Sequence, residues 1–242
     1  MRAFFMSTQN IVRNENVVQG ILDTFLFEDQ KINFKKEHIE RTYEAFQYIA
    51  ENYNTYQNIT VAALTKIYTK IEEQLKQQNP KPVIVRLVFS IFDFELYYLE
   101  IKPHEKIKSP VELELRLCTH CQAPQLTQHK WFDRQYWNEH LLKIQRSSAD
   151  VLIFMQNQEL VETSRFNLFL YNKAEQVVYT PPLTSGCLNG VFRRFCLKQK
   201  LIHLPEVGPT PLFEKKIFVQ DLKLNQLFVA NSVRSLLTTK LV

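Results

Sequence analysis

Glycine is so scarce in this chain that its positions constrain the fold more than any other feature. The 242 residues contain 4 glycines, and Gly186 and Gly190 stand together just after the stiff Pro181-Pro182 pair. In a chain this poor in flexible residues, a glycine marks a place where the backbone turns tightly or passes close to another group. The segment therefore predicts a constrained connection.

The residues after Gly190 predict a helix over 190–199. Apolar side chains at Val191, Phe192 and Phe195 recur with helical spacing, so Gly190 lies at the helix start. The first amides of a helix have no acceptor within it, and the helix dipole favours negative charge there. Most such turns only connect elements, but this one is also a candidate anion site, and other segments must decide between the two.

Composition and charge limit the class of protein. A hydrophobic content of 45% and a charged content of 23% are those of a globular protein with one large domain or two smaller ones. Apolar runs are too short for a membrane span or a secretory signal, so we expect a cytoplasmic protein without a membrane partner. The net charge of +5 is dispersed and accompanies no nucleic-acid-binding motif, so we expect no nucleic acid partner.

Four cysteines raise the question of a metal site. Cys118-Thr119-His120-Cys121 has the spacing of a metal-ligand pair. A structural zinc site needs a second pair of comparable spacing, and Cys187 and Cys196 lie too far apart to supply it. Because thiols stay reduced in the cytosol, we expect no metal.

Hydrophobic periodicity predicts an α/β protein with two lobes. Helices are predicted over 38–53 and from Thr60, a plausible N-cap, to Asn79-Pro80. A third helix is expected near 137–142. Strands are predicted at 83–89, 94–101, 111–117, 151–155, 166–170, 177–179, 217–219 and 225–230. The pattern favours an N-terminal α/β domain over 1–120 and a C-terminal α/β domain over 121–242.

Five segments follow one another in a characteristic order. They are His38-Ile39-Glu40-Arg41, His129-Lys130, 160–169, 180–194 and 229–234. This order resembles the class IV aminotransferases, which are fold type IV enzymes that carry pyridoxal 5'-phosphate (PLP). The resemblance implies a smaller N-terminal domain, a larger C-terminal pseudo-barrel domain with the cofactor, a small-molecule amino substrate and a homodimer.

The resemblance implies that Lys130 is the catalytic lysine. A neutral lysine amine links covalently to an aldehyde, and burial or a cationic neighbour lowers the lysine pKa enough to leave it reactive. In the family, the lysine of this motif carries PLP and later moves the α-proton of the substrate. The motif His129-Lys130 assigns both roles to Lys130.

Glu162 and Asn167 match the family's Glu-x-x-x-x-Asn pattern. A carboxylate beside the pyridine nitrogen of PLP keeps that nitrogen protonated, which stabilises negative charge on the substrate carbon. The resemblance gives Glu162 this role, whereas the residues alone would allow an exposed glutamate at a strand end. We expect Asn167 to be a structural residue of the cofactor site that fixes the strand or Glu162 by hydrogen bonds.

The resemblance also implies a phosphate site built from three segments. Its members are the Arg41 side chain, the helix start at Gly190 with the amides of Val191 and Phe192, and the hydroxyl of Ser232. The planar, permanently charged fork of Arg41 suits phosphate. Arg41 could instead pair with Glu37 or Glu44 on the same helix.

Two further groups of basic residues have different expected roles. Arg234 follows Asn231-Ser232 in a motif that lies near the site in the family, so it is the candidate for binding a substrate carboxylate. Arg193, Arg194, Lys198 and Lys200 cluster on the predicted helix, and such clusters are usually solvated faces.

Within the family, the segments 180–194 and 231–234 are most similar to the 4-amino-4-deoxychorismate lyases. That resemblance implies a reaction yielding 4-aminobenzoate and pyruvate in folate biosynthesis. The alternatives are a PLP-dependent transaminase of branched-chain or D-amino acids and a non-catalytic relative of the fold, against which the presence of Lys130 and Glu162 argues. Two departures bear on the pocket: Trp131 replaces a small residue or threonine, and Asn189 replaces a frequent proline.

Overall fold

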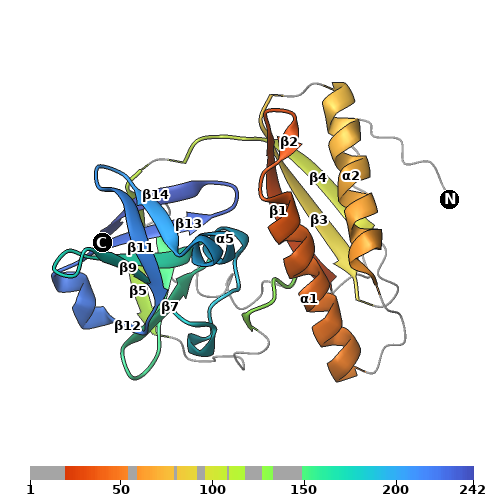
Figure 1. The fold of residues 1–242 in the computed structure, drawn as a ribbon. Coiled ribbons are helices and arrows are strands. Elements are labelled where there is room, and N and C mark those ends of the chain that lie inside the picture. The colour runs from red at the N-terminus through yellow and green to blue at the C-terminus, as the bar shows by residue number, and fades with distance from the viewer. Residues whose placement is uncertain are drawn as a thin grey trace.

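Two β-sheets face one another, and the chain passes from the smaller to the larger (Figure 1). The computed structural model describes residues 20–53, 59–78, 81–91, 96–107, 109–117, 127–132 and 149–242. The smaller sheet has four antiparallel strands in the order β2-β1-β3-β4. The larger has ten in the order β10-β11-β9-β8-β13-β14-β5-β6-β7-β12.

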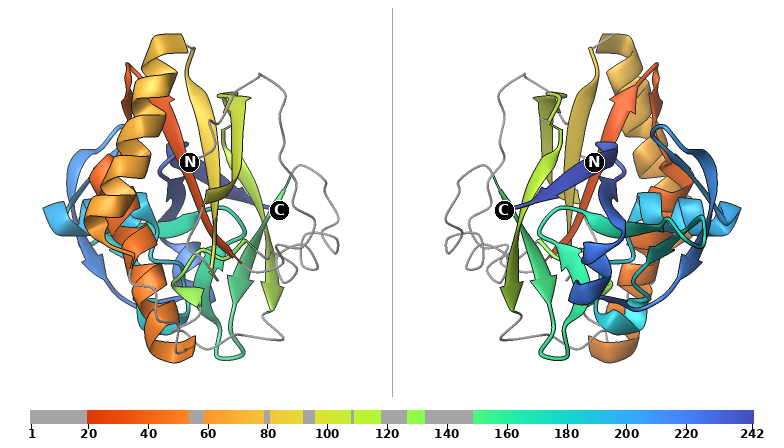
Figure 2. Two further views of the ribbon diagram at one scale, coloured as in Figure 1. Left: turned by 90° about the vertical axis from the view of Figure 1, so that its right-hand side faces the viewer. Right: turned by 90° about the vertical axis from the view of Figure 1, so that its left-hand side faces the viewer.

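Two helices, which follow one another between the second and third strands, cover one face of the smaller sheet (Figure 2). The elements are β1 (Gly20–Glu28), β2 (Lys31–Ile32), α1 (Lys35–Tyr53), α2 (Val61–Gln78), β3 (Val83–Ser90) and β4 (Leu96–Pro103). Successive strand residues point to opposite faces. In β1, Ile21 and Phe25 therefore pack in the core under the helices, whereas Leu22 and Thr24 face a cavity between the two sheets.

The apolar stripe predicted for the first helix is confirmed. Ile39, Phe46 and Ile49 are buried against the sheet, although α1 begins at Lys35, three residues earlier than predicted. Thr60 caps α2 as expected, since its Oγ1 accepts a 3.1 Å hydrogen bond from the amide of Ala63.

The larger sheet is mixed and buries both of its faces. Its elements are β5 (Val111–Leu117), β6 (Asp150–Phe154), β7 (Glu159–Thr163), β8 (Asn167–Asn172), β9 (Val177–Thr180), α5 (Val191–Gln199), β10 (Leu201–Leu204), β11 (Gly208–Glu214), β12 (Ile217–Phe218), β13 (Gln226–Asn231) and β14 (Ser235–Leu241). Leu168 and Leu170 of β8 join one core, while Phe169 joins another beneath α5. Two short 3-10 helices, Leu183–Ser185 and Val219–Lys223, lie between strands of the larger sheet.

Several elements differ from the sequence prediction. The strands β1, β10, β11 and β14 were not predicted, and in β1 a buried Asp23 interrupts the apolar alternation that signals a strand. The predicted helix near 137–142 and the Cys118–Cys121 segment lie outside the described residues. β5 pairs with β14 and β6 of the larger sheet, and the domain division after residue 120 stays a prediction.

The basic cluster on α5 is only partly the solvated face that the sequence suggested: Lys198 and Lys200 are exposed, whereas Arg193 and Arg194 are not. Arg193 is 2% exposed and donates to the carbonyl of Pro181 and to Glu214. Arg194 and Lys198 instead form ion pairs with Glu44 and Glu40 of α1. The cluster therefore ties α5 to its own sheet and to the helix of the smaller one.

No helix in the described part of the chain is long and apolar enough to cross a membrane.

The core beneath α1 should dominate stability. Phe46 is 2% exposed and its ring lies 5.9 Å from that of Phe89, so Phe46→Ala leaves a cavity and should lower the free energy of unfolding by about 3–5 kcal/mol. Leu224, which is 83% exposed, offers a matched control. Leu224→Ala should change stability by less than about 0.5 kcal/mol in urea denaturation; equal losses would contradict this account of the core.

Candidate active site

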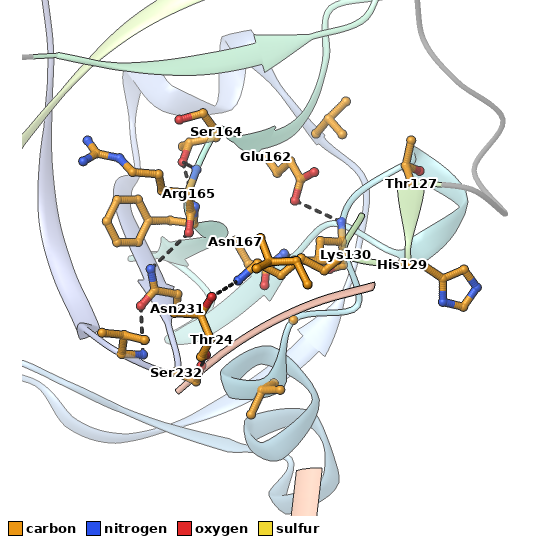
Figure 3. Close-up of a pocket in the computed structure, with 18 of the residues that line it drawn as sticks. Thr24, Thr127, His129, Lys130, Glu162, Ser164, Arg165, Asn167, Asn231 and Ser232 are labelled. Carbon is orange, nitrogen blue, oxygen red and sulfur yellow. Dashed lines mark hydrogen bonds between the residues drawn. The ribbon is translucent and has the colours of Figure 1, made fainter. Parts of the chain in front are cut away.

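A cavity of about 580 Å³ lies between the two sheets (Figure 3). That size is typical of a site for a small molecule or cofactor. Thr24 and Arg41 line it from the smaller sheet and α1, Lys130 from the connection, and Glu162 and Ser232 from the larger sheet. Residues far apart in the sequence therefore meet in one place.

Backbone pairing with β1 fixes the position of Lys130. The Leu22 amide donates a 2.8 Å hydrogen bond to the carbonyl of Lys130, and Trp131 pairs with Ile21 in an antiparallel bridge. The Lys130 ammonium donates to Oγ1 of Thr24 at 3.1 Å, and the two side chains point toward one another in Figure 3. No sequence pattern marks Thr24, because a threonine within a strand is ordinary.

Trp131 forms part of the cavity wall rather than filling the cavity. Its ring packs against the core of the smaller sheet and contacts the rings of Tyr48 and His129, at 6.5 and 6.3 Å between centroids. His129 also lines the cavity, and burial lowers its pKa. At neutral pH the imidazole is therefore uncharged.

Glu162 is held by the loop that precedes α5. Its Oε2 accepts a 2.9 Å hydrogen bond from the amide of Leu188. Asn167 donates from Nδ2 to the carbonyl of the same Leu188, also at 2.9 Å. Glu162 and Asn167 thus hold one loop residue, Leu188, by its amide and by its carbonyl. The structural role of Asn167 in a cofactor site stays a prediction.

Gly190 is a glycine because of Asn167. A Cβ on Gly190 would lie 1.9 Å from Oδ1 of Asn167, well inside any allowed contact. Its φ of −66° needs no glycine, whereas Gly186, with φ of +91°, supplies the left-handed turn. The sequence predicted a close approach at Gly190, and in the structure the group approached is the Asn167 side chain.

The N-terminus of α5 lies at the cavity. Gly190 and Val191 line it, and no side chain caps this helix. Such an end favours an anion. The Phe192 ring packs against the rings of Phe34 and Phe169 rather than lining the cavity. A contact between the Phe192 amide and a phosphate stays a prediction.

Arg41 lines the cavity from α1 while remaining 5% exposed. Its charge partner is Asp23, rather than Glu37 or Glu44. Ser232 lies in the turn between β13 and β14, and its hydroxyl is 3.4 Å from the carbonyl of Thr24. Arg41, Ser232 and the start of α5 thus line one cavity, and their role as a phosphate site stays a prediction.

Two more arginines line the cavity and are linked through Asn231. The Asn231 side chain donates to the carbonyl of Arg165 at 3.1 Å and accepts from the amide of Arg234 at 2.8 Å. Arg165 is anchored through Nε to Asp150 at 3.1 Å. Burial, and then the charge of Arg165, lowers the pKa of Arg234. Within the described residues, Nη1 of Arg234 is buried without a hydrogen-bond partner, which suits an anionic ligand.

The cavity therefore carries several basic side chains and one acidic side chain in its described lining. Arg41, Arg86, Lys130, Arg165 and Arg234 line it, and Glu162 is the one carboxylate among the described lining residues. This donor set fits PLP: an amine for the aldehyde, a carboxylate for the pyridine nitrogen, and a guanidinium with helix amides for the phosphate.

The described residues hold no group of three or more potential metal ligands. Cys187 and Cys196 are free thiols, and burial raises the pKa of each to about 12, so both are unreactive.

Comparison with known proteins identifies the family. The model for "Amino-transferase class IV" matches residues 20–241. The chain belongs to the class IV aminotransferase family. Membership agrees with the fold type IV architecture and makes PLP the expected cofactor. A search of curated proteins gives no significant sequence match.

Solved structures share the fold of this class IV chain at low identity. A hypothetical aminotransferase from Mycobacterium tuberculosis in PLP-bound form has a TM-score of 0.78 at 12% identity, covering 98% of this chain and 87% of its own. A fold IV transaminase from Curtobacterium pusillum has 0.75 at 12%, covering 99% and 83%. A 4-amino-4-deoxychorismate lyase from Pseudomonas aeruginosa has 0.71 at 16%, covering 99% and 88%. Lyase and transaminase share the fold, so the fold does not choose between them.

The close approach of Gly190 to Asn167 gives a stability test. Gly190→Ala should lower the free energy of unfolding by about 1–3 kcal/mol, because the new methyl group displaces Asn167. Asn167→Ala removes the obstructing atoms, so the double variant should lose clearly less than the sum of the single losses in urea denaturation. Additive losses would show that the two residues are not in contact.

Proposed function

We propose that this class IV enzyme is a PLP-dependent 4-amino-4-deoxychorismate lyase that releases 4-aminobenzoate and pyruvate for folate biosynthesis. The observation that carries the proposal is the pair Arg165 and Arg234 in the cavity that holds Lys130 and Glu162. The substrate of this lyase carries two carboxylates, one on its ring and one on the enolpyruvyl group. Two arginines match two carboxylates.

A branched-chain transaminase would use the Arg165–Arg234 side of the cavity differently. Its substrate has one carboxylate and an apolar side chain, so only one guanidinium of the Arg165–Arg234 pair would have a substrate carboxylate to bind. The motif forms at 180–194 and 231–234 also favour the lyase. Transamination by the same catalytic residues is the competing outcome in the assay below.

Residues of this chain would hold PLP at its phosphate and at its pyridine nitrogen, in addition to the covalent link through Lys130. Arg41, Ser232, Gly190 and the first amides of α5, those of Val191 and Phe192, would bind the phosphate. Glu162 would face the pyridine nitrogen, and Asn167 would hold the loop that positions Glu162. When bound, the cofactor supplies an electron sink for the carbon that loses its proton.

Lys130 would carry the cofactor and then act on the substrate. Once the substrate amine has replaced it, the Lys130 amine is available to take the proton from the substrate carbon, assisted in its position by Thr24. Arg165 and Arg234 would hold the carboxylates so that the pyruvate group leaves in a fixed orientation. Elimination needs no 2-oxo acid as amino acceptor, which separates it from transamination.

The family resemblance also supports a homodimer in the cytoplasm. Size-exclusion chromatography with light scattering would test it: a mass of twice the 28.8 kDa chain supports the dimer, and a mass of 28.8 kDa contradicts it.

Lys130 should be the site of covalent cofactor binding. With PLP added, the wild type should show a visible absorbance band, and borohydride should fix the cofactor on the peptide containing Lys130. Lys130→Ala should lose both the band and turnover while keeping its circular dichroism spectrum, because both the covalent link and the base are removed. A trapped adduct on another lysine would contradict the assignment.

The reaction itself can be separated from transamination in one assay. With 4-amino-4-deoxychorismate and no 2-oxo acid, the enzyme should release pyruvate and 4-aminobenzoate in equal amounts over many turnovers. Arg234→Ala and Arg165→Ala should each raise KM about tenfold or more, since each removes a charge-assisted contact. Arg116→Ala, which changes an arginine paired with Glu114 outside the cavity, is the control. Turnover that occurs only with an amino acid and a 2-oxo acid would establish a transaminase instead.

A further inference from the structure

A buried polar cluster lies behind the phosphate side of the cavity. It consists of Asp23 on β1, His38, Arg41 and Thr42 on α1, and Tyr68 on α2, and we call it the Asp23 cluster. Asp23, His38 and Tyr68 are completely buried. Of the five, Arg41 alone lines the cavity.

The alternation of β1 creates this arrangement. Thr24 faces the cavity and contacts Lys130, so Asp23 must face the helices, within the apolar core. A carboxylate in such a place is costly unless it is paired and hydrogen-bonded. The residues around Asp23 must therefore supply donors and a positive charge.

Three side chains supply them. Nδ1 of His38 lies 2.8 Å from Oδ1 and 2.9 Å from Oδ2 of Asp23. The Tyr68 hydroxyl donates to Oδ2 at 2.6 Å, and the guanidinium of Arg41 contacts Oδ1 through one Nη atom. The planar fork of arginine has five N–H donors, so a contact through one nitrogen leaves most of them for an anion in the cavity.

The charges within the Asp23 cluster balance. Burial alone would raise the pKa of Asp23, but His38, the charge of Arg41 and the Tyr68 hydrogen bond outweigh it and hold that pKa well below its usual value. Burial lowers the pKa of His38, which is therefore neutral and donates from Nδ1. One carboxylate thus offsets one guanidinium before any ligand is bound.

We infer that Asp23 is a positioning residue that fixes the Arg41 guanidinium for the phosphate of the cofactor. The inference rests on the proposed function in one respect, that the cofactor is PLP with its phosphate at Arg41. Asp23 touches neither the cavity nor the ligand and acts only through Arg41. No sequence pattern marks Asp23 for this role, because a lone aspartate in an apolar run is usually evidence against a strand.

Asp23→Asn tests the inference because it keeps the shape of the side chain and removes the charge. The dissociation constants of PLP and of pyridoxal, which lacks the phosphate, would be measured by fluorescence for the wild type and the variant. We expect the constant for PLP to rise about tenfold or more while that for pyridoxal changes by less than about twofold. Removing a negative charge near the phosphate would by itself strengthen PLP binding, so a weaker affinity can come only from lost positioning.

Tyr68→Phe is the matched control. It removes one hydrogen bond to Asp23 and leaves the contact between Asp23 and Arg41, so PLP affinity should stay within about twofold of the wild type. In an Arg41→Ala background, Asp23→Asn should cause no further loss of PLP affinity. If Asp23→Asn does not fold, Asp23→Glu, which keeps the charge but displaces it, should still weaken PLP more than pyridoxal.

The outcomes separate this inference from the cofactor assignment. A wild type that binds no PLP overturns both. Suppose instead that the wild type binds PLP. The role of Asp23 alone is then overturned if the Asp23 variants leave PLP affinity unchanged, raise it, or weaken the binding of PLP and pyridoxal equally.

Discussion

The backbone pairing of β1 with the Lys130 segment is the contact on which the site depends. The hydrogen bond from the Leu22 amide to the Lys130 carbonyl joins the smaller sheet to the connection between the sheets. It places the lysine beside Thr24, in the cavity that Glu162 also lines. Without this pairing, Lys130 would be one more lysine on a connecting segment.

The second constraint is charge. Five cationic side chains line a cavity with one described carboxylate, and three of them, Arg41, Arg165 and Arg234, make up two candidate anion sites. Arg41 is neutralised from behind by Asp23, and Arg165 is anchored by Asp150. Among the described residues, no acid is hydrogen-bonded to the Arg234 side chain, and its buried Nη1 leaves a donor for a ligand. The arrangement gives the cavity one anion site at the start of α5 and another at the Arg165–Arg234 pair.

Sequence patterns predicted the parts of the fold that repeat with a regular period. The amphipathic helix α1, the capped α2 and the apolar strands β3 and β8 all carry a periodic signal. β1 does not, since Asp23 sits in its buried face and is acceptable only because α1 and α2 bring donors to it. The ion pairs of Arg194 and Lys198 with α1 were likewise invisible, because they join residues about 150 positions apart.

The candidate site was predicted through motif order rather than through geometry. Lys130, Glu162, Arg41 and Ser232 do line one cavity. The motifs do not include Thr24 or Asp23, and they assign no role to Arg165, because the roles of all three depend on neighbours from other elements. Gly190 shows the limit clearly. The scarcity of glycine in the chain indicated that the backbone at Gly190 turns tightly or passes close to another group. Only the fold identifies that group as the Asn167 side chain.

A crystal structure of the enzyme with PLP would test the account most directly, since it would show which anion site holds the phosphate. The account predicts continuous density from Lys130 to the cofactor, the phosphate between Arg41 and the first turn of α5, and the pyridine nitrogen at Glu162. The Arg165–Arg234 pair should remain open for substrate. Phosphate density at that pair, or a cofactor not joined to Lys130, would contradict the proposed site.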